Sequence, residues 1–321
     1  MKDLRNALLI HNPNAGGGGA SRRAKLDSAR RILESRGIVA DLAETTGPGD
    51  ATEIARSAGT QGRQLVIACG GDGTINEVVN GLAGAENGHR VPMALLPAGT
   101  ANILAKELEL SWDIPTAAEQ LARGEVRDLA LGLATPLEQP EKARYFLSVA
   151  GAGPDGRITY AVDLELKARM GILAYWWQGA REVFNYKFQH FRVTSEGESR
   201  EVSLVIVGRT KHYGGPFKIT TQADLFEDQF EFLGLTTQSG LKYLTYLPQL
   251  WFGDLRKEEG VYFWKSDRLV CEPIDAEPPT YAQVDGEPLT RLPVEFRIVP
   301  RALRLLVPGP VNEAAKSPEA A

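Results

Sequence analysis

A glycine-rich stretch, GGDGT at residues 70–74, stands between an apolar run and a helix-like pattern. Successive backbone N–H groups in a glycine turn can point into one concavity and bind an anion. A helix after the turn adds unpaired N–H groups and the positive end of its dipole, and glycines leave no Cβ in the way of a ligand. The stretch is a candidate phosphate-binding turn. A plain helix start is the compatible alternative, because Thr74 and Glu77 have the spacing of a capping box.

Two other turns have a similar composition, and the best-known phosphate loops do not fit GGDGT. HNPNAGGGG at residues 11–19 and PAGTAN at residues 97–102 each follow an apolar run. GGDGT lacks the lysine of a Walker A loop, and the third glycine of a dinucleotide fingerprint would fall on Asn76. Because loops at the carboxyl ends of parallel strands line one edge of an open α/β sheet, we expect the three turns to converge.

The elements around these turns alternate between strand and helix, which favours a parallel sheet covered on both faces. Strands are predicted at 7–10, 38–46, 64–69 and 91–97, and helices at 21–37, 51–59, 74–84 and 100–108. After about residue 130 the segments become mainly strand-like, interrupted by two aromatic-rich helical stretches at 166–184 and 241–253. This second half predicts a mainly antiparallel β domain, a sandwich or an open barrel.

Composition narrows the class of protein. The 321 residues are comfortable for two domains, and 43 % hydrophobic with 24 % charged residues is ordinary for a globular protein. The net charge of −5 gives nucleic-acid binding no support, and two cysteines make no disulfide framework. No segment reads as a secretory signal or approaches the roughly 18 apolar residues of a spanning helix. We expect a cytoplasmic protein whose membrane contact is transient and peripheral, at the inner membrane surface.

The motifs, taken in order, resemble the diacylglycerol kinase catalytic-domain family, which includes bacterial soluble lipid kinases and sphingosine kinases. The stretches that carry the resemblance are Asn12-Pro13 with Ala15-Gly16, GGDGTINEVVNG (70–81), LPAGTANILAKEL (96–108), VAGAGPDGRI (149–158), LKARMGILAY (166–175), ADLFEDQFEF (223–232) and QVDGE (283–287). The resemblance implies an α/β plus β fold: a Rossmann-like parallel-sheet nucleotide-binding domain at 1–130, then a mainly antiparallel β-sandwich lipid-substrate domain at 131–300. Residues 301–321 are expected to return to the first domain and to end in a disordered tail.

By resemblance, ATP lies in a cleft between the two domains, and Asp72 helps to hold the Mg²⁺ bound to it. The residues implied to bind this cofactor lie in and beside the three turns: Asn12, Thr45, Gly70, Gly71, Asp72, Gly73, Thr74, Ile75, Asn76 and Thr100. For Thr45 the alternative is an ordinary loop residue.

The resemblance assigns catalysis to Asp285 and Glu287, which alternation along a strand would place on one face. Either carboxylate could take the proton of an acceptor hydroxyl, and we favour Asp285 as the base with Glu287 as its partner. The alternative is that Asp285-Gly286 is only a hairpin turn. Pro154 stands where an aromatic residue is usual, and Asp155 could cap a helix or loop or support the active site.

A structural Mg²⁺ site is implied at Asp224, Glu227 and the carbonyl of Gln229. Two departures from the family pattern weaken it: Glu227 is longer than the expected aspartate, and Asp228 stands where glycine is usual. Mg²⁺ demands tight octahedral oxygen geometry, so a solvated acidic turn is the alternative.

The implied activity is an ATP- and Mg²⁺-dependent lipid kinase, with diacylglycerol first and sphingosine, ceramide or phosphatidylglycerol as other acceptors. NAD kinase and a non-catalytic binding module are the competing functions; the Ser-Thr-Ala-Tyr stretch usual in NAD kinases is missing. The aromatic helices could line a lipid groove or pack in the core. The basic residues Arg22, Arg23, Arg30 and Arg31 could meet anionic headgroups or form a solvated face. A homodimer through an edge strand is left open.

Overall fold

The chain forms two compact units, each built from segments that are distant in sequence. The computed structural model describes residues 4–17, 19–86, 90–161, 188–213, 217–252, 254–275 and 277–310. The first unit comprises Met1–Gly99, Leu108–Asp128 and Leu303–Ala321, and the second comprises Thr100–Glu107 and Leu129–Ala302. The aromatic stretch expected to be helical at 166–184 and the polar tail from residue 311 lie outside the described residues.

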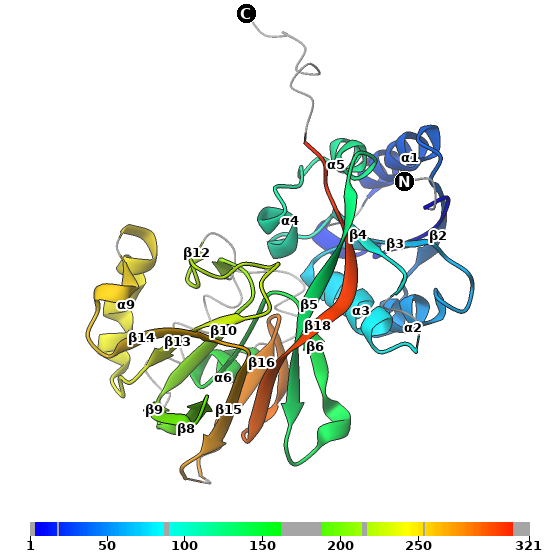
Figure 1. Cartoon of the computed structure of the whole chain (residues 1–321). Coiled ribbons are helices and arrows are strands. Elements are labelled where there is room, and N and C mark those ends of the chain that lie inside the picture. The colour runs from blue at the N-terminus through cyan, green and yellow to red at the C-terminus, as the bar shows by residue number, and fades with distance from the viewer. Residues whose placement is uncertain are drawn as a thin grey trace, which may run out of the picture. The chain divides into compact units, whose positions relative to one another are not determined.

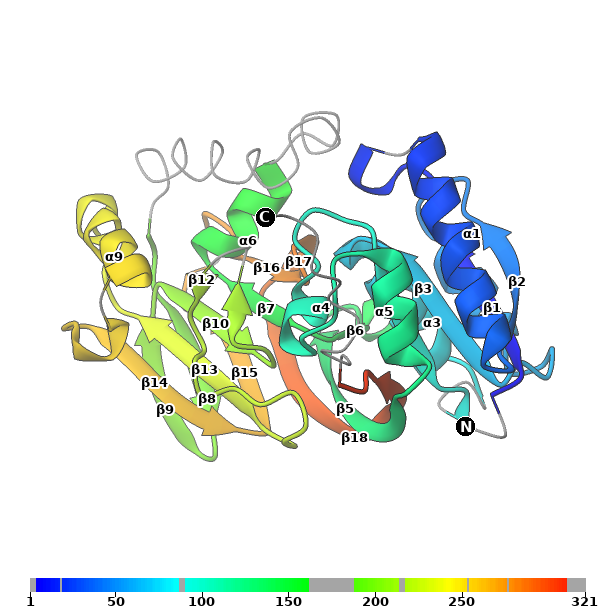
Figure 2. The same ribbon diagram turned by 90° about the horizontal axis from the view of Figure 1, so that it is seen from above.

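The first unit is a parallel sheet with helices on both faces (Figure 1). Its strands lie in the order β2 (Val39–Glu44), β1 (Asn6–His11), β3 (Leu65–Gly70), β4 (Met93–Pro97), followed by the end of β18 (Val294–Val307), where Leu305 pairs with Met93. Its helices are α1 (Ala20–Ser35), α2 (Asp50–Ser57), α3 (Asp72–Ala83) and α5 (Ile114–Leu121). Helices α1 and α5 cover one face, which Figure 2 views directly, and α2 and α3 cover the other. Because both faces are covered, every residue of β3 and β4 is buried.

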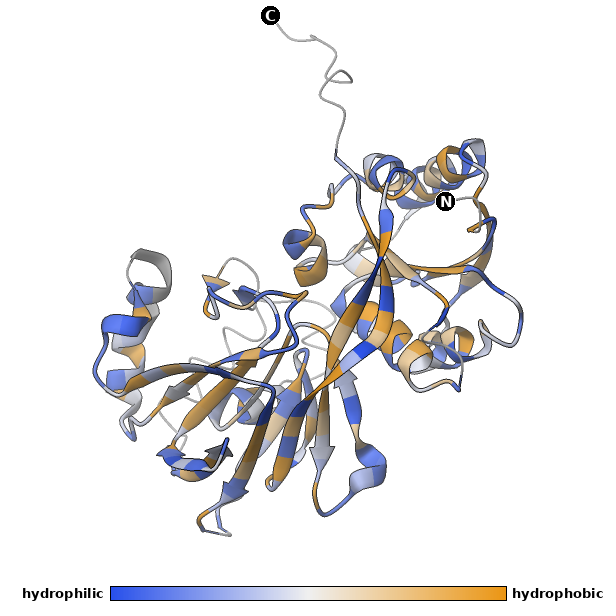
Figure 3. Ribbon diagram, in the orientation of Figure 1, coloured by the Kyte–Doolittle hydropathy of each residue, from blue (hydrophilic) through white to orange (hydrophobic). Residues whose placement is uncertain are grey.

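The second unit packs two layers of mainly antiparallel strands around a phenylalanine-rich core. One layer has the order β14 (Val261–Ser266), β13 (Phe230–Leu235), β10 (Leu204–Gly208), β7 (Val149–Ala152), β16 (Tyr281–Val284), β17 (Glu287–Arg291). The other contains β9 (Glu198–Val202), β8 (Phe191–Ser195), β15 (Arg268–Pro273), the first part of β18, the later part of β5 (Glu125–Pro136) and β6 (Arg144–Phe146). Their inner faces meet at Phe146, Phe191, Phe230, Phe232 and Phe296. Figure 3 shows the hydrophobic residues that run along the strands of both units.

Shorter elements complete the described parts of the chain. These are the helices α4 (Ile103–Glu107), α6 (Pro154–Ala161) and α9 (Gly240–Phe252), the short strands β11 (His212–Tyr213) and β12 (Phe217–Lys218), and the 3-10 turns η1 (Ala15–Gly17), η3 (Pro140–Lys142) and η4 (Leu255–Lys257). Among the described residues, no helix has the length and apolar character needed to cross a membrane. The expected fold class, an α/β unit followed by a β-sandwich unit, is confirmed.

Candidate functional site

The first two glycine-rich turns and residues 97–99 of the third pack together in the first unit, at the carboxyl ends of β1, β3 and β4. The backbone N–H of Asn12 donates to the carbonyl of Cys69 at 3.0 Å, and that of Ala98 donates to the carbonyl of Gly70 at 3.0 Å. A Cβ on Gly16 would lie only 2.4 Å from the Ala98 carbonyl oxygen. The convergence expected from the sequence is therefore present, and it depends on close backbone approach.

The GGDGT turn leads directly into α3, but the expected capping box does not form. Helix α3 begins at Asp72 with Gly71 at its N-cap, so Thr74 lies inside the helix and not at the N-cap. Thr74 Oγ1 accepts from Asn12 Nδ2 at 3.1 Å, while the Glu77 carboxylate accepts from the N–H groups of Gly49 and Ala51, at 2.9 and 3.1 Å. The capping-box prediction was wrong because two tertiary partners compete for these side chains. Glu77 caps the neighbouring helix α2, and Asn12 ties the first turn to the second.

Gly70 fixes the tight entry into α3. A Cβ at this position would lie 2.5 Å from Thr74 Cβ and 2.6 Å from Thr74 Oγ1, well inside van der Waals contact. The sequence therefore requires glycine here for the turn to bring Asp72, Gly73 and Thr74 into the first turn of α3. Ile75 and Asn76 follow in the same helix and are buried. The N–H groups in the first turn of a helix lack partners within the helix, so the amino end of α3 is a suitable place for an anion.

The two predicted threonine contacts fall in different units. Thr45 follows β2 and is buried, and its backbone N–H donates to the carbonyl of His11 at 2.9 Å, which places it at the same sheet edge as the turns. Thr100 comes directly after Gly99 along the chain but groups with the second unit.

One of the basic residues of α1, Arg22, lies beside the glycine-rich turns, a position that the sequence patterns did not predict. Arg22, in the first turn of α1, donates to the carbonyl of Gly16 at 2.8 Å. Burial lowers the pKa of His11 below its ordinary 6.5, Glu44 raises it, and Arg22 and Arg23 lower it again. Burial also raises the pKa of the Cys69 thiol to about 12, with Arg22 acting in the opposite direction. The charge of Arg22 therefore lowers the pKa of a residue at the end of β1 and of one near the end of β3.

The other arginines of α1 have separate environments. Arg23 is exposed and lies 3.7 Å from Glu44, and Arg30 donates to the carbonyl of Ala40 at 3.0 and 3.2 Å. The basic residues thus do not act as one solvated face, since Arg22 belongs to the glycine-rich turns.

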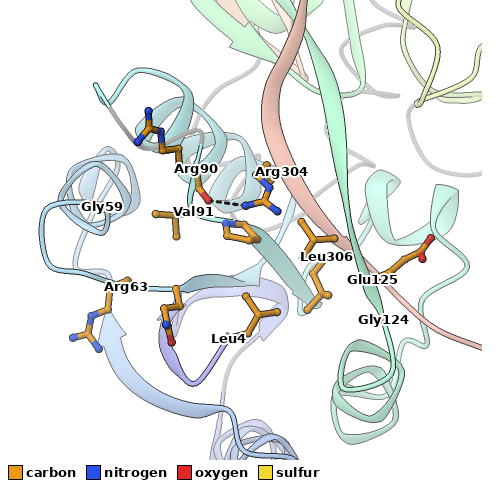
Figure 4. Close-up of a pocket in the computed structure, with 12 residues that line it drawn as sticks. Leu4, Gly59, Arg63, Arg90, Val91, Gly124, Glu125, Arg304 and Leu306 are labelled. Carbon is orange, nitrogen blue, oxygen red and sulfur yellow. Dashed lines mark hydrogen bonds between the residues drawn. The ribbon is translucent and has the colours of Figure 1, made fainter. Parts of the chain in front are cut away.

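A pocket of about 590 Å³ in the first unit lies at the opposite edge of the sheet (Figure 4). Residues that line it, such as Leu4, Gln64 and Pro92, precede β1, β3 and β4, whereas the turns follow these strands. Arg304 crosses it and donates to the carbonyl of Arg90 at 3.3 Å. Each of these strands is several residues long at about 3.3 Å per residue, so this pocket is separate from the glycine-rich turns.

In the second unit, Asp285 and Gly286 form the turn of the β16–β17 hairpin. Their φ angles are +47° and +77°, the positive values that a two-residue hairpin of type I′ requires. The prediction that Asp285 and Glu287 share one strand face was wrong, because the chain reverses between them. Glu287 opens β17 and forms an ion pair with Arg144 at 2.5 Å.

The Asp285 carboxylate is held by three backbone donors. Oδ2 accepts from the N–H of Leu147 at 2.9 Å, and Oδ1 accepts from the N–H groups of Ser148 and Val149 at 2.9 and 3.0 Å. In return, the N–H of Asp285 donates to the carbonyl of Val149 at 2.7 Å. Donors of this kind stabilise the ionised carboxylate and fix its orientation.

A buried carboxylate, that of Asp155, supports the same hairpin. Asp155, in the first turn of α6, accepts from the Tyr213 hydroxyl and from Gln283 Nε2, the latter at 2.6 Å. Gln283 Oε1 accepts from the N–H of Gly286 at 2.8 Å, so the contact chain reaches the turn. Burial raises the pKa of Asp155, and its hydrogen bonds with Tyr213 and Gln283 lower it. Asp155 therefore contacts the hairpin turn through Gln283.

The three expected metal ligands, Asp224, Glu227 and Gln229, point to different partners. Asp224 Oδ1 accepts from the N–H of Phe226 at 2.8 Å, and the Glu227 carboxylate pairs with Lys265 at 2.8 Å. The carbonyl of Gln229 accepts from Arg209 at 3.1 Å. Within the described ranges, no group of three or more histidine, cysteine or acidic side chains is arranged to hold a metal ion.

Family comparisons agree with both units. The diacylglycerol kinase catalytic domain matches residues 6–134, and the YegS C-terminal NAD kinase beta sandwich-like domain matches residues 148–307. The chain belongs to the diacylglycerol kinase catalytic-domain family. As a member of this family it is a kinase, a phosphotransferase with an alcohol group as acceptor.

Relatives of the kinase match it nearly end to end. The diacylglycerol kinase of Bacillus subtilis (strain 168) is 28 % identical over 308 residues, covering 95 % of this chain and 97 % of the relative. That of Staphylococcus saprophyticus subsp. saprophyticus is 26 % identical over 311 residues, covering 96 % and 97 %. A solved diacylglycerol kinase from Bacillus anthracis str. Sterne, 23 % identical, superposes with a TM-score of 0.74 over 97 % of this chain and 98 % of that one, which shows the shared fold.

The aromatic residues of α9 that the structure describes pack into the kinase's second unit. Tyr246 is buried and its hydroxyl donates to the carbonyl of Glu259 at 3.1 Å, while the ring of Tyr243 packs at a tilt against that of Phe188, with the ring centres 5.5 Å apart. These two tyrosines therefore pack in the core, which was the alternative to lining a lipid groove. Tyr175, Trp176, Trp177 and Phe184 lie outside the described residues, as do the side chains of Trp251 and Phe252.

Proposed function

We propose that this kinase transfers the γ-phosphate of ATP to the hydroxyl group of a lipid, with diacylglycerol as the first acceptor. The observation that carries the proposal is the close approach of the first two glycine-rich turns and residues 97–99 of the third, beside the amino end of α3, in a chain of the diacylglycerol kinase family. The proposal names Asn12, Thr45, residues 70–76 and Thr100 as the ATP contacts. Mg²⁺ bound to ATP, with Asp72 beside it, would neutralise part of the phosphate charge.

Asp285 is proposed as the base. Phosphoryl transfer needs little covalent help from the protein, so positioning and a proton acceptor for the incoming hydroxyl are its main requirements. Hydrogen bonds from three backbone N–H groups hold the Asp285 carboxylate in one orientation. The contact between Asp155 and Gln283 supports the turn that carries it. Glu287, paired with Arg144, is proposed as a partner rather than the base.

The lipid acceptor is the finer part of the proposal. The names of the curated relatives support diacylglycerol, and the acceptor of such an enzyme lies in a membrane, so the proposal includes transient peripheral contact with a lipid surface. NAD is kept as a second candidate acceptor because the match to the second unit is described as NAD kinase beta sandwich-like.

The test is transfer of labelled phosphate from ATP and Mg²⁺ to diacylglycerol, monoacylglycerol, phosphatidylglycerol, ceramide and sphingosine in mixed micelles, with NAD in parallel. Label in diacylglycerol is the expected result, and a preparation carrying Asp285→Ala measures any contaminating activity. Label in another lipid alone would show that the acceptor is that lipid and not diacylglycerol, while the lipid kinase activity would stand. Label in NAD alone would contradict the lipid proposal.

Arg22 is expected to contribute to ATP affinity. Because its guanidinium lies against the first turn, Arg22→Met should raise the KM for ATP about tenfold, the size of one charge-assisted hydrogen bond. Arg23→Met is the matched control, since the neighbouring arginine is exposed and should change this KM less than twofold. Equal KM values for the two variants would remove Arg22 from the proposed phosphate site.

A further inference from the structure

The acidic loop that follows β12 is organised around a buried guanidinium. Arg209 comes directly after β10 and is completely buried. Its Nη1 donates to the carbonyls of Glu227 and Gln229 at 2.5 and 3.1 Å, and its Nη2 donates to those of Leu225 and Ala130 at 2.5 and 2.9 Å. Three of these four carbonyls belong to the loop, which therefore curves around one cation.

The charges around this guanidinium are complementary. Burial lowers the pKa of Arg209 to about 10, while Asp228, Asp224 and Glu227 raise it. An arginine side chain stays protonated in proteins, so Arg209 carries its charge inside the second unit. Burying a charge is costly unless hydrogen bonds and opposite charges offset the cost. The loop supplies three carbonyl acceptors, and its acidic residues favour the charged guanidinium.

The groups that would supply oxygen ligands to a divalent ion are already bound to other protein groups. Mg²⁺ requires about six oxygen atoms at roughly 2.0–2.1 Å in an octahedron. The Gln229 carbonyl is bound to Arg209, Asp224 accepts from the N–H of Phe226, and Glu227 pairs with Lys265. An ion placed among the loop carbonyls would also lie within hydrogen-bonding distance of the guanidinium, where the two positive charges repel each other.

We propose that the Arg209 guanidinium occupies the place of the structural metal ion, so that the loop at 224–229 folds without Mg²⁺. The two departures from the family pattern in this loop fit the replacement. The loop no longer needs a short aspartate at position 227, and the added charge of Asp228 acts on the guanidinium. This inference concerns the second unit alone and does not depend on which acceptor the kinase uses.

The test is hydrogen–deuterium exchange of peptides covering residues 222–230, measured without nucleotide in EDTA, in MgCl₂ and in CaCl₂. We expect the same protection of the loop in all three solutions. Slower exchange that saturates with added metal and is lost in Asp224→Asn would overturn the proposal.

Substitutions test the arginine directly. Arg209→Met should speed exchange of the loop about tenfold or more, because it leaves several carbonyls without a donor. Loop exchange in Arg209→Lys should be faster than in the wild type and slower than in Arg209→Met, since one ammonium keeps the charge but cannot reach all four carbonyls. Arg30→Met is the matched control for loss of an arginine–carbonyl contact in the first unit and should leave the loop unchanged. Unchanged loop exchange in Arg209→Met would contradict the inference; should that variant not fold, the wild-type metal comparison and Arg209→Lys decide.

Discussion

Asp285→Asn is expected to lower the kcat for phosphate transfer by about 10²–10⁴-fold, the usual contribution of a positioned base. An amide cannot take up the proton of the acceptor hydroxyl. It also disturbs the turn, because both carboxylate oxygens accept backbone N–H groups, and an amide nitrogen would face one of these donors. One unsatisfied donor should cost about 1–3 kcal/mol of stability. Kinetics at saturating ATP, together with thermal unfolding, separate the two effects.

Glu287→Gln is the companion variant that identifies the base. Its carboxylate opens β17 and pairs with Arg144, so its loss should lower kcat much less than the loss of Asp285. The opposite ranking would transfer the role of base to Glu287. Wild-type kcat in Asp285→Asn, with ATP and Mg²⁺ saturating, would contradict the proposed mechanism.

Gly70→Ala is expected to abolish measurable ATP binding while the second unit stays folded. The added Cβ would overlap Thr74 Cβ at 2.5 Å, so Thr74 must move and its bond with Asn12 must break. Overpacking of this kind costs about 1–3 kcal/mol and displaces the backbone that is proposed to cradle phosphate. Calorimetric titration with ATP and thermal unfolding of the same samples measure both consequences.

A glycine between β2 and α2, Gly47, supplies the control for this substitution. A Cβ on Gly47 meets no atom within 4 Å, so Gly47→Ala should leave ATP affinity and stability nearly unchanged. The double variant Gly70→Ala with Thr74→Gly removes the overlap and should regain stability. ATP affinity in Gly70→Ala within twofold of wild type would show that the turn does not need its close approach.

Local patterns predicted the architecture of the first unit well because its signals are local. Apolar runs followed by glycine turns and by 3.6-residue periodicity identify β1, β3, β4 and α3 without any tertiary information. Helix α5 was missed although Asp113 caps it and Pro115 stands in its first turn, which are ordinary start signals. Strand β14 was missed as well, because its pattern does not alternate cleanly between buried and exposed positions.

The parts of the site that could not be predicted depend on partners far away in the sequence. Glu77 has the spacing of a capping box, yet its carboxylate bonds to Gly49 and Ala51, which sequence spacing within α3 cannot reveal. Nothing in the letters distinguishes Arg22 from Arg23, and only the fold brings the first against Gly16. Likewise Arg209 follows an apolar strand without any motif, although it gathers carbonyls from Leu225, Glu227 and Gln229.

The Asp285-Gly286 turn is a case in which two local signals competed. The dipeptide is a strong hairpin signal, whereas strand alternation through QVDGE would have placed both carboxylates on one face. The positive φ of both residues shows that the hairpin signal prevailed. The same turn brings the Asp285 carboxylate onto the N–H groups that follow β6, so the structural and the proposed catalytic interpretations are compatible.

The pairing of Leu305 with Met93 has a consequence for synthesis of the chain on the ribosome. Domains generally fold as they emerge, amino-terminal first, at about 5–20 residues per second. Strand β4 emerges with β3 as one neighbour, but its other neighbour is the end of β18, near the carboxyl terminus. Until then β4 is an open edge, a template for pairing with other nascent chains. A chain that ends before Leu303 would keep this open edge permanently. Because β4 is only five residues long, few of its backbone groups are exposed at that edge.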